Sequence, residues 1–171
     1  ISPEVWASDA TQMEQWLTER CQVWSNGNYD ILYQSFREIT IMFGINEKNL
    51  PNLLVLSAMN IAVDLLRWAI EWDWSSGSMN ACITISCGKP NKFIFTHNQF
   101  TSMESFGPPF EKQMRLRESM ELNSIVVCDE TAFRIKSLMF GFEFEECGDG
   151  AYIFIIPNQY RPEMYSDNIQ L

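Results

Sequence analysis

Apolar residues recur at three- and four-residue steps over Leu50–Trp74, the longest stretch of the chain with an unbroken helical pattern. Such spacing gives a wide apolar stripe along one side of a helix, which is typical of a helix packed on a sheet. Asn49 is the predicted cap, and Pro51 is tolerated in the first turn. We expect this segment to be the central helix of the fold.

Shorter elements are predicted before and directly after this helix. Residues 8–23 have the spacing of a short amphipathic helix, and a turn at 26–28 leads into one or two strands within 31–42. Residues 79–86 fit either a buried strand or a short helix, because periodicity does not separate the two. A strand is predicted at 92–96.

The C-terminal half predicts a helix and a hairpin in close succession. Pro108 and Pro109 predict a loop at 106–110, followed by an exposed helix at 111–122. Asp129 is the expected cap of a helix over 129–140 that Gly141 ends. The stretch FEFEECGDGAYIFIIP then predicts a β-hairpin, and 158–171 a loop with one short strand.

Together these elements predict an α+β fold in which a mainly antiparallel sheet packs against the one long central helix, with additional shorter helices. A length of 171 residues with 46% hydrophobic content suits a single domain. Because the first residue is Ile1 and not Met, we expect residues 1–171 to be a fragment of a larger protein. Asp64 and Arg67 interrupt the long helix, so no apolar run approaches the roughly 18 residues of a membrane span and we expect no membrane partner.

Charge is unevenly distributed along the chain. The formal net charge of −10 disfavours broad attraction to a nucleic-acid backbone. Residues 89–136 differ, because they carry seven of the 12 basic residues against six acidic ones. A bound anion is therefore expected near this middle segment, although mixed charge of this kind is also ordinary solvated surface.

Familiar catalytic motifs are absent from the sequence. The five cysteines form no CxxC pair, which disfavours a disulfide framework or a zinc site and favours a reducing compartment. There is no Gly-rich phosphate loop, nucleophile elbow or paired metal-ligand motif. His97 has no nucleophile motif to serve, so a hydrolase or nuclease is the least favoured class. Glu143, Glu145 and Glu146 are expected on a wet sheet face, and we expect no catalytic residue, cofactor or metal.

Three stretches carry a resemblance to a known family: EITIMFGINEK at 38–48, the long helix with SSGSMNACITIS after it, and TAFRIKSLMFGFEFEECGDGAYIFIIPNQ. In this order they resemble the middle, cap-binding domain of polymerase basic protein two, a subunit of the orthomyxovirus RNA polymerase. The resemblance implies a thogotovirus-like member, a non-catalytic domain of the cap-snatching machinery in viral transcription and replication. It also implies other polymerase subunits as partners, viral RNA or capped host mRNA reached through the full complex, and a location in the virion and the host nucleus.

The family resemblance also implies positions for a cap site. In that family, 7-methylguanine stacks between two aromatic rings while a carboxylate and a lysine contact it. The candidate residues carried over by position, or adjacent to those positions, are Met42, Phe43, Asn46, Glu47 and Lys89.

The carried-over residue types differ from the family's chemistry at several positions. Met42 stands where the family has a ring, Asn46 where it has a carboxylate, and Ile61 near the helix lysine. We therefore expect a degenerate cap site with a structural or subunit-contact role. A working cap-binding module that uses shifted residues, and an unrelated protein-interaction module, are the alternatives.

Overall fold

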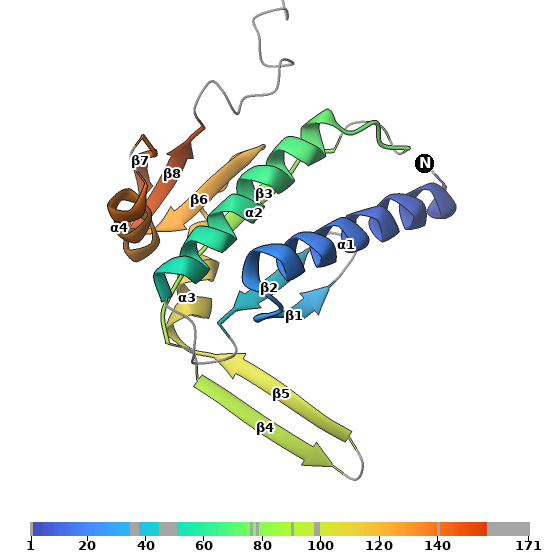
Figure 1. Ribbon diagram of the computed structural model, residues 1–171, viewed down its shortest axis with the longest axis horizontal. Helices are drawn as coiled ribbons and strands as arrows, with labels where there is room; N and C mark the ends of the chain where they lie inside the picture. The colour runs from blue at the N-terminus through green and yellow to red at the C-terminus, as the bar shows by residue number, and fades with distance from the viewer. Residues whose placement is uncertain are drawn as a thin grey trace, which may run out of the picture. The chain divides into compact units, whose positions relative to one another are not determined.

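The computed structural model describes residues 2–34, 38–44, 51–75, 77, 79–89, 91–97, 100–139 and 141–156. Within these residues it contains four helices and eight strands (Figure 1). The chain divides into two compact units, one of residues 1–81 with 156–171 and the other of residues 82–155. That the chain is one domain cut from a larger protein stays a prediction.

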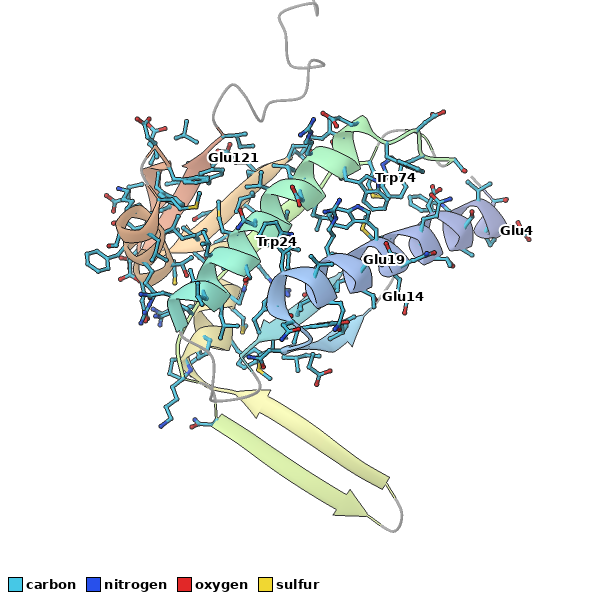
Figure 2. The ribbon with its side chains drawn as sticks, in the orientation of Figure 1. Glu4, Glu14, Glu19, Trp24, Trp74 and Glu121 are labelled. Atoms are coloured by element: carbon cyan, nitrogen blue, oxygen red, sulfur yellow. The ribbon has the colours of Figure 1, made fainter. Side chains whose placement is uncertain are left out.

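The first unit contains α1 (Pro3–Ser25), β1 (Tyr29–Gln34), β2 (Ile39–Phe43) and α2 (Pro51–Glu71). The hydroxyl of Ser2 accepts the Val5 N–H at 3.4 Å and caps α1, and Asn26 ends the helix with a left-handed φ of 51°. β1 and β2 pair antiparallel. α1 packs against α2, and Figure 2 shows Glu4, Glu14 and Glu19 along α1, where all three are exposed.

A hydrophobic cluster joins both helices to the β1–β2 pair. Its buried centre consists of Leu17 and Cys21 from α1 and Ile61 from α2, none more than 4% exposed. Alternate residues of β2 reach this cluster, as the two-residue period of a strand requires. The partly buried side chains around the centre are Met13, Trp16, Tyr29, Ile39, Ile41, Phe43 and Leu65.

Four tryptophans form an aromatic cluster between α1 and the end of α2: Trp16, Trp68, Trp72 and Trp74. The rings of Trp16 and Trp68 are stacked, with centroids 4.8 Å apart and an angle of 3° between their planes. Trp74 meets Trp68 edge-on at 4.7 Å, and its indole N–H donates to the Ala69 carbonyl at 2.8 Å. The Arg20 guanidinium lies 5.4 Å from the Trp16 ring centroid, within cation–π range.

Polar contacts with backbone groups also connect α1 to the segment containing α2. Asp9 is only 1% exposed, and its carboxylate accepts the Ser75 backbone N–H at 3.2 Å. At the other end of α1, the Ser57 hydroxyl is 2.8 Å from the carbonyls of Trp24 and Leu53. Of these groups, the Trp24 carbonyl lies in the last turn of α1, where the helix leaves carbonyls without a partner of its own.

The second unit is built on a four-stranded sheet in the order β3-β6-β8-β7. β3 (Cys82–Ile85) and β6 (Ser124–Cys128) are parallel, whereas β8 (Ala151–Ile155) pairs antiparallel with β6 and with β7 (Glu143–Gly148). β6 is buried at every position. α3 (Pro108–Arg117) contacts β3 and β6, and α4 (Asp129–Leu138) contacts β6 and β8. β4 (Asn91–His97) and β5 (Phe100–Phe106) form a separate hairpin.

The expected arrangement of one long central helix on a mainly antiparallel sheet is wrong. The described residues form a small α+β fold with four helices, of which α1 has 23 residues and α2 has 21. The largest sheet among the described residues is mixed and belongs to the second unit. α2 ends at Glu71, three residues before the predicted end at Trp74, so Trp72 and Trp74 of the aromatic cluster follow the helix.

Several local predictions hold and others do not. The hairpin around Gly148 and the helix after Cys128 are confirmed, and residues 82–85 are a strand. The sequence interpretation missed β5 and β6. The predicted loop at 106–110 is wrong, because Gly107 turns the chain with a φ of 108° and α3 starts at Pro108. Proline is tolerated there, since the first helical N–H groups have no partner within the helix. Residues 158–171 lie outside the described part.

The length and composition of α2 also meet the criteria for a membrane span, contrary to the sequence-based expectation. The stretch Asn52–Glu71 has a mean hydropathy of 1.7 and is 39% buried. A core helix of a soluble protein passes the same test, so this finding is weak evidence for a membrane span.

The stacked tryptophan pair is expected to contribute substantially to the stability of the first unit. Trp68→Ala removes a ring that contacts three other tryptophans and should lower the free energy of unfolding by about 3 kcal/mol. Trp24→Ala is the matched control: that side chain is 41% exposed, so its loss should cost less than about 1 kcal/mol. Urea unfolding followed by circular dichroism compares the two, and equal midpoints would contradict this role of the stack.

Candidate functional site

Two cysteines come together where β3 and β6 end at the same edge of the sheet. Ile85 lies opposite Val127 in the parallel pairing, so Ser86 and Cys87 leave β3 beside Cys128. Cys128 ends β6 and is also the N-cap residue of α4. Parallel pairing therefore brings into contact two residues that are distant in sequence.

Cys87 and Cys128, the thiol pair, share one hydroxyl. Thr131 Oγ1 lies 3.2 Å from the Cys128 sulfur and 3.4 Å from the Cys87 sulfur. Cys128 is 2% exposed and Thr131 is fully buried, whereas Cys87 is half-buried. Both cysteines pack in one apolar cluster with Leu116, Val126, Ala151 and Ile153.

The two thiols differ in acidity. A hydrogen bond from Cys87, with a further one from Thr131, lowers the pKa of Cys128 against the opposing effect of burial. The same hydrogen bond, together with burial, raises the pKa of Cys87. A position at a helix N-terminus favours a thiolate in the same direction. These effects make Cys128 the more acidic thiol of the pair.

An ionic network of Lys112, Glu130 and Arg134 lies beside the thiol pair. Lys112 Nζ is 3.2 Å from a Glu130 oxygen and donates to the Cys87 carbonyl at 3.3 Å, while Arg134 reaches Glu130 at 2.9 Å. The hydrogen bond from Arg134, and then the one from Lys112, lowers the pKa of Glu130. Burial opposes ionisation of Lys112, but Glu130 and the charge on Cys128 raise its pKa. Lys112 and Arg134 thus share the Glu130 carboxylate.

Polar contacts also hold the start of α3 at this edge of the sheet. Ser86 Oγ donates to the Pro109 carbonyl at 2.7 Å. One turn further, the Gln113 side-chain amide donates to the Thr84 carbonyl at 3.1 Å and also contacts the Thr84 hydroxyl. α3 is therefore fixed to the end of β3, and the position of Lys112 follows from that attachment.

The arrangement offers a dithiol and cationic groups for an anion. Within the part of the chain that the structure describes, no group of three or more His, Cys, Asp or Glu side chains is placed to hold a metal ion. All five cysteines are free. The chemistry available here is thus thiol chemistry and the binding of negative charge.

The proposed cap-site residues are not brought into one described cluster. Met42 and Phe43 lie on β2 in the first unit, where Phe43 packs against the hydrophobic cluster. Lys89 is exposed and follows β3 in the second unit. Asn46 and Glu47 lie outside the described residues. The assignment of these five as ligand contacts stays a prediction.

Sequence reasoning missed the residues of this edge. The basic excess in residues 89–136 was a partial signal, because it includes Lys112 and Arg134. The thiol pair gave no signal, since Cys87 and Cys128 are far apart in sequence and form no recognised motif. They become neighbours only through the pairing of β3 with β6, a strand that was not predicted.

Comparison with known proteins finds the same fold in nucleotidyl cyclases. No protein-family model and no curated protein matches the sequence. The guanylate cyclase domain of RhGC from Catenaria anguillulae, solved in complex with GTP, is 14% identical with a TM-score of 0.72, over 91% of this chain and 86% of that one. The adenylyl cyclase CyaB from P. aeruginosa is 10% identical with a TM-score of 0.75, over 95% and 88% of the two chains.

These likenesses overturn the family assignment made from sequence. The similar solved structures are adenylyl and guanylyl cyclase domains, and not the cap-binding domain of an orthomyxovirus polymerase. The viral-polymerase function, the cap-snatching role, the non-catalytic assignment and the viral partners inferred with it are therefore corrected. The chain has the fold of nucleotidyl cyclase catalytic domains.

Proposed function

We propose that this chain is a nucleotidyl cyclase domain that converts a purine nucleoside triphosphate into a cyclic nucleotide and pyrophosphate. The observation that supports this proposal is the fold likeness, which extends over nine-tenths of the chain and most of the cyclase domain in each comparison. One similar structure was solved with GTP and another, of converted specificity, with ATPalphaS. A purine nucleotide is the shared substrate class.

The proposed reaction is an internal phosphoryl transfer. The ribose 3′ oxygen loses its proton to solvent and bonds to the α-phosphorus, while the bond from that phosphorus to the bridging oxygen breaks and pyrophosphate leaves. Negative charge builds on the leaving group, so nearby cations stabilise the transition state. In this chain, Lys112 and Arg134 are candidates for that role, because both cations are partly exposed and lie together at Glu130.

The activity is tested with the purified chain, GTP or ATP, and Mg²⁺ or Mn²⁺ as the counter-ion of the triphosphate. We expect a cyclic purine monophosphate and pyrophosphate in equal amounts, resolved by chromatography and mass spectrometry. Inorganic phosphate and a nucleoside diphosphate in their place would indicate simple hydrolysis. If the assay finds no cyclic product and no saturable nucleotide binding, the proposal is contradicted.

The role of the ionic network is tested by removing its cations. Lys112→Ala and Arg134→Ala should each lower kcat/KM for the triphosphate by at least about tenfold, because a charge-assisted hydrogen bond contributes about 1.5–3 kcal/mol. Lys136→Ala is the matched control: it removes the same charge from α4, but its ammonium faces the Phe144 ring and belongs to no described ion pair of the network. If the three variants have the same kcat/KM as the original chain, these cations do not stabilise the transition state.

A second copy of the chain is the partner we propose. One similar structure, the guanylyl cyclase domain of RhoGC from Blastocladiella emersonii, is described as a non-canonical dimer and also in a monomeric form. In the second unit of this chain, Met114, Leu122 and Phe133 are each at least 70% exposed, which is apolar surface available for association.

The oligomeric state is measured by sedimentation equilibrium over a concentration series. We expect a monomer–dimer equilibrium, and a specific cyclase activity that rises with the dimer fraction. A strictly monomeric chain whose specific activity is independent of concentration would contradict this partner.

A further inference from the structure

We propose that Cys87 and Cys128 form a reversible intramolecular disulfide when the protein meets hydrogen peroxide, so that the edge where β3 and β6 end is a redox-modification site. The proposal rests on the geometry of the second unit alone and does not depend on the cyclase activity.

The backbone places the two residues within disulfide range. Ile85 pairs with Val127 in the parallel register. Ser86 therefore comes level with Cys128, and Cys87 is one residue further along. If the strand spacing of about 4.8 Å and the rise of about 3.3 Å per residue are extended past the end of β3, they give about 6 Å between the two Cα atoms. Disulfides span roughly 4.4–6.8 Å between Cα atoms. No large backbone movement is therefore required.

The side chains already lie against each other. Each sulfur is within hydrogen-bond distance of Thr131 Oγ1. Both belong to the same apolar cluster, which holds their positions. The remaining cysteines are elsewhere: Cys21 is buried in the first unit, and Cys82 and Cys147 are exposed on β3 and β7.

The chemistry of the pair suits a two-step oxidation. Cys128, at the N-terminus of α4, is the thiol of the pair whose pKa is lowered, and it reacts as the thiolate after losing its proton. It attacks one oxygen of the peroxide, the O–O bond breaks, and a sulfenic acid and hydroxide form; the hydroxide takes a proton and leaves as water. The Cys87 thiol then loses its proton and attacks the sulfenic sulfur, the S–O bond breaks, and a second water leaves. Two thiols lose two electrons, and one peroxide gains them.

The half-buried position of Cys87 gives a small oxidant its approach to the pair, because Cys128 itself is almost fully covered. Oxidation removes the acidic thiol of Cys128 and ties the chain after β3 to the last residue of β6, which is the N-cap of α4. The modification therefore changes the charge of the edge as well as its freedom to move.

The experiment treats the reduced full chain with a slight excess of hydrogen peroxide, and blocks the remaining thiols. Non-reducing digestion and mass spectrometry should then find a peptide pair joined through Cys87 and Cys128, with the mass loss of two hydrogens, and dithiothreitol should restore the reduced mass. Cys147→Ser is the matched control, which removes an exposed thiol and should leave the linked pair unchanged. Cys87→Ser and Cys128→Ser should each abolish it.

The mapping on the unsubstituted chain decides the proposal even if a variant fails to fold. Oxidation confined to Cys82 or Cys147, whether as acids or as bonds between chains, would overturn it. Sulfinic acid at Cys128 without any link to Cys87 would also overturn it, because the second thiol would then have failed to resolve the first oxidation product.

Discussion

The parallel pairing of β3 with β6 is the interaction on which the second unit depends. It joins residues 82–85 to residues 124–127. Because the two strands are parallel, the segment between them must bring the chain back to the start of β3 before β6 begins. α3 packs on both strands of the pair, and α4 starts directly where β6 ends. The position of Lys112, of Thr131 and of both thiols follows from that single register. A shift by one residue would turn the side chains of β6 to the opposite face and separate the pair.

The parts of the fold that could be predicted are those with local signals. Strict alternation on both sides of Gly148-Asp149-Gly150 predicts the β7–β8 hairpin, and the apolar stripe of α2 is visible in sequence even though the helix ends three residues early. β6 could not be found this way, because SIVVC is a short, wholly apolar run whose identity as a strand depends on neighbours distant in sequence. The two prolines before α3 were interpreted as breakers, although the first turn of a helix accommodates them.

The site was harder to predict than the fold for a related reason. A catalytic or binding motif is recognised when its residues are close in sequence or at a known spacing, and Cys87 with Cys128 satisfies neither condition. The family resemblance failed because it depended on ordinary supersecondary structure, namely a helix followed by a glycine and an acidic hairpin. The same elements occur in nucleotidyl cyclase domains in an order that the three-dimensional comparison recognises at 10–14% identity. Such elements identify a layout, whereas chemistry depends on particular side chains.

The crossover between β3 and β6 contains the β4–β5 hairpin and α3, and these two parts are expected to be under different evolutionary constraints. Asn91 lies opposite Phe106, so the hairpin leaves and rejoins the crossover at neighbouring points. Because its two ends meet, the hairpin can lengthen, shorten or diverge without changing the distance that the rest of the crossover must bridge. Natural variation is therefore expected to accumulate in the hairpin, while α3 and the strand ends, which set the register, stay fixed. In this sense the hairpin is a segment that one lineage could lengthen or replace while the four-stranded sheet is inherited unchanged.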